Sequence, residues 1–381
     1  MKCRFLFLGA AGCALALAAL LPAAVYAQEG PGTTSGESVA KPKAKAPPNG
    51  EAPPPQNETP IPSQYQKHPS QANTPTYRAQ ADTVTVDVAV LDNHDHFIPK
   101  LQEPYFRVLE DGVPQKIVQF SHGDAPITIC LVVEFSGRFQ AFWSYGWYET
   151  LQAAYGFLST LKPDDNVAVV SYAMHTHILS DFSPDKNKAK QALSELRIPG
   201  FSEANVFDAL TDIAGRMSGI QGRKAILLIA SGIDTFSKIT YGTARKDLQE
   251  DGVPIYTISI LQVARMLAQD RGMSPIANMD FLQADNEMRT FSKETGGLSF
   301  FPRFLGEYPT IFRQIESALR NEYTLSYHPT DTAHDGKFRH IKVELVNPET
   351  DAPLRIVNQK HKAIKYRIIA KSGYKAPREV E

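Results

Sequence analysis

The stretch from Ile127 to Gln140 (ITICLVVEFSGRFQ) constrains the fold of this chain more than any other. Ile127–Val133 is an uninterrupted apolar run rich in β-branched residues, which is typical of a strand buried on both faces of a parallel sheet. The polar residues Glu134, Ser136 and Arg138 follow directly. Open α/β sheets place their ligands outside the carboxyl ends of such strands. The sequence therefore predicts a central strand with a candidate binding site at its end.

Further apolar runs alternate with helix-like segments downstream. We expect strands at Val167–Tyr172, Ala225–Ala230, Ile255–Ile260 and Leu298–Phe301. We expect helices at about Tyr148–Leu161, Lys186–Leu196, Asn205–Ser218, Gly242–Glu250, Asp280–Lys293 and Tyr308–Leu319. Alternation of buried strands with helices predicts a parallel sheet that is covered on both faces.

Segments with strand-like alternation lie on both sides of this unit. Before it, we expect strands at Val84–Val90, Tyr105–Glu110 and Gln115–Phe120, with a hairpin turn at Asp111-Gly112. After it, we expect strands at Tyr323–Tyr327, Phe338–Val346 and Lys365–Ala370. The predicted fold class is α/β: a doubly wound, mostly parallel, Rossmann-like sheet inserted in or flanked by a small antiparallel β-sandwich. The predicted boundaries are 81–125 and 322–377 for the two sandwich parts, 126–321 for the α/β domain, and 378–381 for a tail.

The N-terminal region has the pattern of an exported protein. Residues 1–27 join a short basic start to an apolar run and the small residues of a cleavage site, which predicts a signal peptide. The alternative is that this run stays as an uncleaved anchor. Residues 28–80 are rich in Pro, Ser, Gln and Asn, so we expect a disordered linker. After signal removal no transmembrane helix is expected, and the protein is placed in the periplasm or outside the cell.

Composition limits the classes of partner and chemistry. A net charge of −1 and an apolar fraction of 43% describe a globular chain and give no reason to expect a nucleic-acid partner. Cys130 is the one cysteine outside the signal segment, and its place in an apolar run predicts a core residue. The basic C-terminal stretch first protects a sheet edge, and its alternative role, like that of the linker, is contact with the envelope. It contains Arg355, Lys360, Lys362, Lys365, Arg367, Lys371, Lys375 and Arg378.

The most specific motifs flank the α/β unit. They read FRVLEDGVPQKI at 106–117, TGG at 295–297, LRNEYTLSY at 319–327, DGKFRHIKV at 335–343 and SGYKAP at 372–377. In this order and at these separations, they resemble the bacterial secreted proteins related to the von Willebrand factor A-type (VWA) domain. The resemblance covers roughly Val84 to Pro377.

The resemblance implies a metal-ion-dependent adhesion site (MIDAS) on three loops at the carboxyl edge of the sheet. The first loop of that site reads Asp-x-Ser-x-Ser. In this chain Glu134 stands at the aspartate, Ser136 is retained, and Arg138 stands at the second serine. A glutamate is one methylene longer than the expected ligand, and an arginine brings a positive charge to the place of the cation.

The other two loops depart from the pattern as well. The second loop of the family offers a threonine, and Ala204 stands there with Glu203 beside it. The third offers an aspartate, and Ser231 stands there with Asp234 nearby. Mg²⁺ requires nearly octahedral oxygen ligands, so this set predicts a degenerate site that holds no metal.

Three interpretations of the edge remain open. No cofactor is expected; the alternative is Mg²⁺ or Mn²⁺ bound by Glu134, Ser136 and Asp234. Without a metal, the edge is either an inert remnant, or Arg138 replaces the cation and pairs with Glu134, Glu203 or a carboxylate of a partner.

Aromatic residues around Arg138 favour a binding role, because arginine and aromatic residues are enriched at interface centres. They are Phe139, Phe142, Trp143, Tyr145, Trp147 and Tyr148. The expected partner-binding residues are Glu134, Ser136, Arg138, Phe139, Trp143, Glu203, Ser231 and Asp234.

Other chemistry is poorly supported by the sequence. The pairs His94/His96 and His175/His177 each offer two imidazoles, which is an incomplete zinc site, and surface histidines are the ordinary alternative. No Gly-x-Ser-x-Gly elbow or Gly-Lys-Ser phosphate loop occurs. The sequence thus predicts an exported, non-catalytic protein-interaction module of the adhesion type. The alternatives are a structural envelope component with an inert site and an enzyme with an unrecognised site.

Overall fold

The computed structural model describes residues 83–123, 125–137, 144–196, 203–262, 265 and 275–378, the last range without 358–360. All of these residues fall within one compact unit. The expected signal segment and linker lie outside the described residues, as do Arg138, Phe139 and Trp143.

Within the described residues, six strands form the central sheet in the order β10-β9-β8-β5-β6-β7. They are β5 (Ile127–Glu134), β6 (Asn166–Tyr172), β7 (Thr176–Ser183), β8 (Arg223–Ala230), β9 (Ile255–Ser259) and β10 (Ser299–Phe300). All neighbours pair in parallel except β6 and β7. The predicted central strand is confirmed: every residue of β5 is buried, and β5 pairs with β6 on one side and with β8 on the other.

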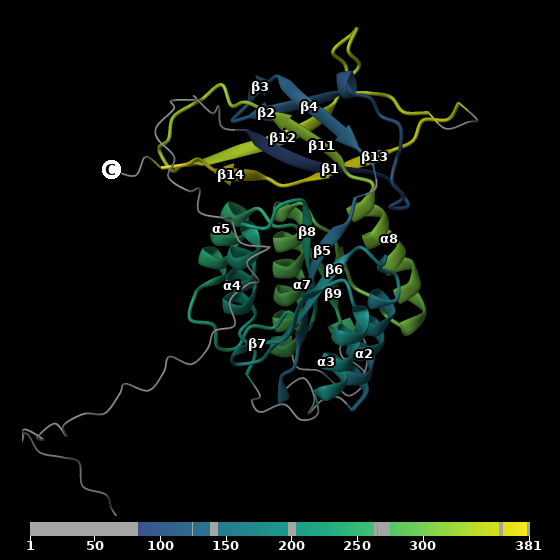
Figure 1. Cartoon of the computed structure of the whole chain (residues 1–381), viewed down its shortest axis with the longest axis vertical. Coiled ribbons are helices and arrows are strands. Elements are labelled where there is room, and N and C mark those ends of the chain that lie inside the picture. Colours follow the sequence, from purple (N-terminus) through teal and green to yellow (C-terminus); the bar gives the residue numbers. More distant parts are fainter. Residues whose placement is uncertain are drawn as a thin grey trace, which may run out of the picture. The chain divides into compact units, whose positions relative to one another are not determined.

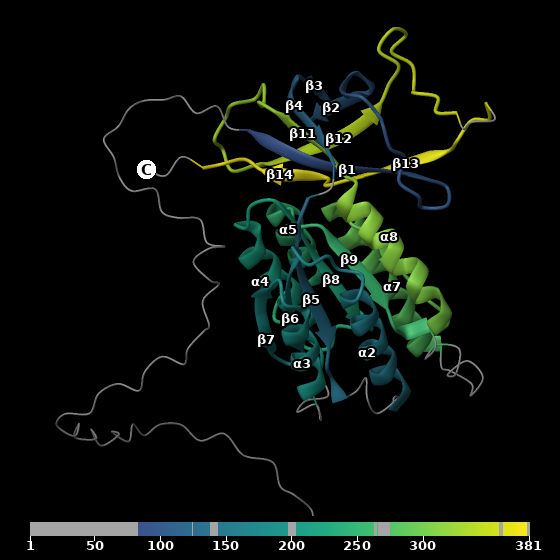
Figure 2. The ribbon, with the colours of Figure 1, turned by 45° about the vertical axis from the view of Figure 1, so that its right-hand side comes forward.

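Helices cover both faces of this sheet, as Figures 1 and 2 show. Side chains of α2, α3 and α8 pack on one face and those of α4 and α5 on the other. Helix α7 contributes Ala284 to the first core and Met288 and Phe291 to the second. The helices are α2 (Ser144–Leu158), α3 (Lys186–Glu195), α4 (Val206–Ser218), α5 (Tyr241–Asp251), α7 (Pro275–Thr295), α8 (Tyr308–Arg320), and the short 3₁₀ segments η2 (Glu103–Tyr105) and η3 (Leu305–Glu307).

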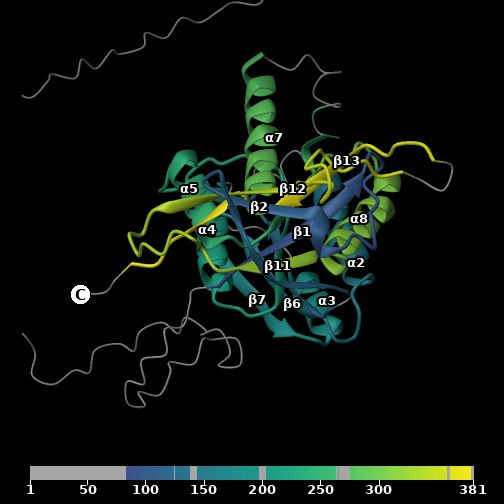
Figure 3. The same ribbon diagram turned by 90° about the horizontal axis from the view of Figure 1, so that it is seen from above.

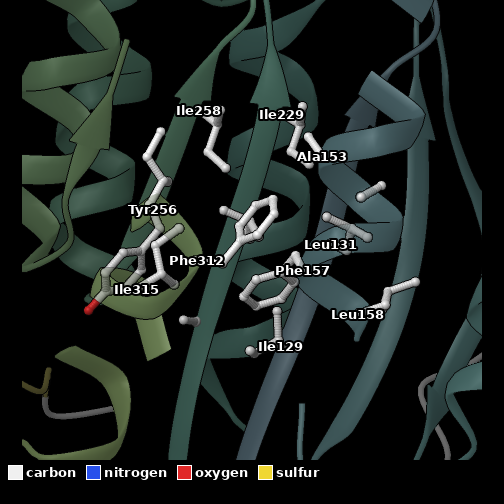
Figure 4. Packing of buried hydrophobic residues seen from close by; sticks show 14 of the residues in the cluster. Ile129, Leu131, Ala153, Phe157, Leu158, Ile229, Tyr256, Ile258, Phe312 and Ile315 are labelled. Atoms are coloured by element: carbon white, nitrogen blue, oxygen red, sulfur yellow. The ribbon is translucent and has the colours of Figure 1, made fainter. Parts of the chain in front are cut away.

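Alternation along β5 divides the core into these two layers. Ile129 and Leu131 point to the α2/α8 face, whereas Cys130 and Val132 point to the α4/α5 face. Figure 4 shows the first layer, where the side chains of Phe157 and Phe312 meet with ring centroids 6.1 Å apart. Because successive strand residues face opposite sides, an unbroken apolar run is what a doubly covered strand requires.

The flanking strands form two four-stranded antiparallel sheets within the described residues, in the orders β13-β1-β11-β4 and β14-β12-β2-β3. Figure 3 shows β1 and β11 of one sheet with β2 and β12 of the other, and side chains of both sheets share one core. The strands are β1 (Val84–Asp92), β2 (Phe106–Glu110), β3 (Val113–Gln115), β4 (Ile117–His122), β11 (Tyr323–Tyr327), β12 (Phe338–Leu345), β13 (Tyr366–Ala370) and β14 (Gly373–Lys375).

The sandwich is closed by strands from both ends of the described chain. Strand β11 pairs with β1 and β4, and β12 pairs with β2. The α/β unit therefore lies between the two parts of one sandwich in the sequence, which confirms the predicted fold class.

The structure corrects two details of the sequence prediction. The single strand expected at Gln115–Phe120 is interrupted at Lys116: β3 pairs with β2 in one sheet, and β4 pairs with β11 in the other. A short strand that changes sheets is a corner of the sandwich. The edge strands β7 and β14 were not expected, because neither carries a clean apolar alternation.

Candidate functional site

The candidate site lies at the point where the chain changes direction in the sheet. From β5 the chain goes to β6 on one side, and it later returns to form β8 on the other. The ends of β5 and β8 flank this switch point, which is where open α/β sheets place their ligand crevice. Glu134 ends β5, and Ser231 follows β8 directly.

In this protein a hydrogen-bond network joins the strand ends at the switch point. Ser231 donates its backbone N–H and its hydroxyl to Oε2 of Glu134, both at 2.7 Å. Ser136 donates its hydroxyl to Oε1 of Glu134 at 2.8 Å, and the Tyr172 hydroxyl lies 3.5 Å from Oε2. These donors come from the ends of β5, β6 and β8, so Glu134 joins three neighbouring strands at their carboxyl ends. We name Glu134, Ser136, Tyr172 and Ser231 the switch-point network.

The network is buried. Glu134 is 2% exposed, Ser136 1% and Ser231 4%. Burial raises the pKa of the Glu134 carboxyl, and the hydrogen bonds from Ser231, Ser136 and Tyr172 offset part of that effect. A buried carboxylate with several hydrogen-bond donors is a satisfied structural group rather than an open ligand.

The second and third loops are joined to each other beside this network. Ala204 donates its backbone N–H to the Thr235 hydroxyl at 2.8 Å, and Thr235 donates its own to the Ala204 carbonyl at 2.9 Å. Asp234 accepts the N–H and the hydroxyl of Ser237 and lies 3.5 Å from the N–H of Phe207. Asp234 is therefore directed to its own turn and to the start of α4.

Helix α4 also forms hydrogen bonds with the loop at 234–239. Asp208 donates its N–H to the Ser237 hydroxyl, and its carboxylate accepts the N–H groups of Lys238 and Ile239. The Asn205 side chain makes no capping bond at the helix start, so the 234–239 loop supplies the partners that the first turn lacks. The loop and the helix thus fix each other.

The oxygen atoms at this edge do not fit the octahedral Mg²⁺ site that the fold suggests. Glu134 is the one carboxylate of the switch-point network, and both of its oxygens accept hydrogen bonds from protein donors. The alanine at 204 offers no side-chain oxygen, and Asp234 is engaged by Ser237. Mg²⁺ prefers six oxygens, usually with one or two carboxylates free to bind it. At the ends of β5 and β8, the structure has one carboxylate, that of Glu134, and one hydroxyl, that of Ser231, which donates to it.

The predicted site residues are therefore only partly brought together. Glu134, Ser136 and Ser231 meet in one network, whereas Glu203 and Asp234 lie on the neighbouring loops and are partly exposed. For Arg138, Phe139 and Trp143 the structure describes no position. Their expected roles in partner binding stay predictions.

A pocket of 440 Å³ opens next to the third loop, and sequence reasoning missed it. It lies between the loop after β8, the start of α4, and α7. From α7 it is lined by Asp280, Gln283 and Glu287. Their spacing of three and four residues places them on one helix face, and this was the one signal in the sequence that could have pointed to them.

The remaining candidates behave as ordinary structural residues. Cys130 is buried, which raises the pKa of its thiol to about 12 and confirms the predicted core position. His94, His96, His175 and His177 are exposed. Among the described residues, no three His, Cys, Asp or Glu side chains are placed to share a metal ion.

Together, the doubly wound sheet and the switch-point geometry define a Rossmann-like α/β domain. Residues 129–294 match the family model described as the von Willebrand factor type A domain. The chain therefore contains a VWA domain and is VWA-related.

Several solved structures are similar to this chain. Proximal thread matrix protein 1 from the mussel byssus has 11% identity and a TM-score of 0.39; the match covers 52% of this chain and 50% of that chain. The chain thus spans about half the length of the mussel protein. The vWF domain of the type V pili tip protein Mfa5 from Porphyromonas gingivalis has 11% identity and a TM-score of 0.39, covering 52% and 97%. A von Willebrand factor type A structure from Catenulispora acidiphila has 10% identity and a TM-score of 0.38, covering 80% and 76%. No curated protein sequence matches this chain.

Proposed function

We propose that this chain is an exported, non-catalytic module that binds a protein partner at the carboxyl edge of its VWA sheet without a metal ion. The export part rests on the signal-like pattern of residues 1–27. No described helix combines the length and the apolar character that a membrane span needs.

The observation that carries the proposal is the saturation of the switch-point carboxylate. Both oxygens of Glu134 accept hydrogen bonds from Ser136 and Ser231, and these groups are buried. A catalytic base needs an accessible lone pair within reach of a substrate proton, and a metal site needs open oxygen ligands. Glu134 offers neither, so the edge is better suited to present a rigid surface than to perform chemistry.

The eight residues expected to bind the partner then fall into two groups. Glu134, Ser136 and Ser231 are buried, and their hydrogen bonds hold the starts of the first and third loops in place. Glu203 and Asp234, with the Arg138, Phe139 and Trp143 segment, are the ones proposed to contact the partner. Exposed aromatic side chains support this division: Tyr148 at the start of α2 is 54% exposed, and Phe236 in the third loop is 57% exposed. Aromatic residues are over-represented at interface centres.

Site-specific photo-crosslinking in the producing cell tests the proposal. A photoreactive phenylalanine replaces Tyr148 or Phe236 in the full chain. The control replaces Val118 of sandwich strand β4, which is 49% exposed and thus similarly accessible. We expect one protein to crosslink from both edge positions, with little product from position 118, and with the same yield in EDTA and in Mg²⁺.

Two results would overturn the proposal. A crosslinking pattern that does not distinguish the edge from position 118 would remove the proposed binding surface. A yield that disappears in EDTA and returns with Mg²⁺ would show that binding requires a metal.

A further inference from the structure

The pocket beside the third loop is a strongly acidic feature of the VWA domain. Three carboxylates line it: Asp234 from the loop after β8, and Asp280 and Glu287 from α7. No lysine, arginine or histidine is among its described lining residues. Its volume of 440 Å³ lies in the range of small ligand pockets, roughly 300–1,000 Å³.

Glu287 distinguishes the pocket from a cluster of surface acids, because its side chain is mostly buried. It is 7% exposed, although it lies in a pocket that opens to solvent. Gln283 donates its side-chain N–H to Oε1 at 2.9 Å, and no described residue donates a hydrogen bond to Oε2. Burial raises the pKa of the Glu287 carboxyl, and the negative charge of Asp234 adds to that effect. Oε2 is not fully enclosed by protein atoms, so a ligand in the pocket can reach it and donate a hydrogen bond to this mostly buried carboxylate.

The third loop and α7 approach each other closely at Gly232, which lines the pocket. Gly232 has a φ of +76°, and a Cβ atom at that position would lie 2.2 Å from Sδ of Met288. A glycine is therefore required there. The loop is therefore held close to the helix where Asp234 and Glu287 line the pocket.

Large apolar side chains are exposed on the same two segments that line the pocket. Phe236 on the third loop and Met279 and Leu282 on α7 are 57%, 68% and 42% exposed. The pocket lining combines acidic side chains with the apolar side chains of Phe207, Ile233 and Ala284, which matches a side chain that carries a cationic end on an aliphatic stem. A metal ion matches it poorly, because the described acidic groups do not converge on one point.

We propose that this pocket receives the lysine or arginine side chain of the protein partner, with Glu287 as the inner acceptor and Asp280 as the outer acceptor, while Asp234, whose oxygens are engaged by Ser237, contributes its negative charge. Arginine fits best, because its five N–H donors can serve several carboxylates at once. The inference rests on the proposed function, since it names the chemistry by which that partner is recognised. It places recognition in the third loop and α7, beside the switch-point network.

Titration of the isotope-labelled full chain, followed by NMR, tests the pocket without any partner. The probes are N-acetyl-arginine amide, N-acetyl-lysine amide and the uncharged isostere N-acetyl-citrulline amide. We expect saturable shifts of the amide signals of 232–235 and 280–287 with the two cationic probes, and affinity at least about tenfold weaker for citrulline, because a charge-assisted hydrogen bond is lost.

Matched variants identify the acceptors. Glu287→Gln and Asp280→Asn should each weaken arginine-amide binding, with Glu287→Gln about tenfold, because the change removes the charge and keeps the shape. Glu195→Gln on α3, an exposed acid outside the pocket, is the control and should bind the probe as the parent chain does. Unchanged amide spectra away from the pocket show that each variant is folded.

Each other outcome overturns the inference. Absence of saturable shifts means that the pocket does not bind cationic side chains. Equal binding of citrulline amide, or equal binding by Glu287→Gln, means that charge recognition is absent. Saturation by Mg²⁺ or Ca²⁺ at the same signals means that the pocket is a metal site. The crosslinking experiment is independent of these results, so a negative titration with edge-specific crosslinks removes the pocket and leaves the proposed function in place.

Discussion

At the scale of single residues, the switch-point network joins the ends of β5 and β8 through the carboxylate of Glu134. Two carboxylates facing each other across β5 and β8 would repel without a cation between them. Here Ser231 takes the place of one of them and donates two hydrogen bonds to Glu134. The longer side chain of glutamate spans the gap between the strand ends. Glu134 and Ser231 are thus complementary, because the hydroxyl and the N–H of Ser231 supply the hydrogen bonds that the carboxylate accepts.

Removal of the Glu134 carboxylate is predicted to destabilise the protein. In Glu134→Ala, the N–H of Ser231 and the hydroxyls of Ser136 and Ser231 lose their acceptor inside the protein. A buried donor left without a partner costs about 1–3 kcal/mol, so we expect the free energy of unfolding to fall by about 2–4 kcal/mol. Chemical denaturation of the parent chain and the variant measures this difference.

A second prediction concerns metal ions: the switch-point network should not bind Mg²⁺ or Mn²⁺. Thermal unfolding of the parent chain in EDTA, Mg²⁺ and Mn²⁺ should give one melting temperature, since a ligand raises it only by binding the folded state. Glu349→Gln, at an exposed position in the loop after β12, is the control and should unfold as the parent does. A melting temperature that rises with Mg²⁺ or Mn²⁺ would contradict the metal-free network.

At the scale of elements, the sequence predicted what depends on local pattern. The strands β5, β6, β8 and β9 were predictable because each is an apolar run, and helix-like segments separate these runs along the chain. The change of sheet at Lys116 was not, because it depends on β11 pairing with β4 from about 200 residues away in the chain. The antiparallel strand β7 was missed for a related reason: its residues are partly exposed and lack alternation.

The candidate site divides in the same way. The chain order alone places Glu134 and Ser231 at strand ends, so their common edge was predictable. The bond between them was not, because it depends on the lateral order of β5 and β8. The pocket could not be predicted, since Glu287 reaches it only when α7 packs beside the third loop. The spacing of Asp280, Gln283 and Glu287 places them on one face of α7, but it does not show which part of the chain packs against that face.

A buried ion pair joins α8 to the sheet, and its loss is predicted to be costly. Asp165, before β6, is 0% exposed at its side chain and accepts from Arg320 at 2.6 and 3.2 Å. Burial alone would raise the pKa of Asp165, but hydrogen bonds from Arg320, Lys162 and Ile127 lower it below 3.8. Asp165→Asn leaves the buried guanidinium without its main counter-charge, so the free energy of unfolding should fall by about 3 kcal/mol.

A second aspartate–arginine pair serves as the control for this change. Asp212 and Arg216 on α4 are 44% and 37% exposed at their side chains and lie 2.9 Å apart. Asp212→Asn should cost less than about 1 kcal/mol, because water screens an exposed pair. Because the pKa of Asp165 is lowered by folding, its stabilising effect is present above 3.8 and is lost as pH falls through the folded value. Equal losses for the two variants at neutral pH would contradict the role of burial.

At the scale of the whole molecule, the sandwich and the VWA domain meet where α8 leads into β11. Arg223 of β8 donates to the carbonyl oxygens of Arg320 and Glu322, the latter at 3.0 Å. The backbone carbonyl oxygen of Glu294 on α7 accepts a hydrogen bond from the N–H of Ser372 at 2.9 Å. The inserted domain therefore contacts both the strand that begins the second sandwich part and the segment between β13 and β14, so the sandwich is expected to depend on the VWA fold for its closure.

Glu322 is a titratable carboxyl at this junction. It is 5% exposed, and no described residue donates a hydrogen bond to its carboxylate. Burial raises its pKa well above 4.5, the charge of Asp87 on β1 raises it further, and Arg223 lowers it in part. Burial and, after it, the charge of Glu322 raise the pKa of the Tyr256 hydroxyl on β9, which has no hydrogen-bond partner among the described residues. The junction therefore favours the protonated acid.

This preference makes the stability of the junction depend on pH, and Glu322→Gln should remove that dependence. A pKa raised by folding gives stability that is complete below the unfolded value of about 4.5 and is lost as pH rises through the folded value. Each pKa unit of difference corresponds to about 1.4 kcal/mol. The melting temperature of Glu322→Gln should therefore exceed that of the parent by an amount that grows from roughly pH 5 to 8, whereas the exposed Glu349→Gln control follows the parent. A difference that stays constant with pH would mean that Glu322 does not titrate in this range, and a difference that shrinks would reverse the assignment of its charge state.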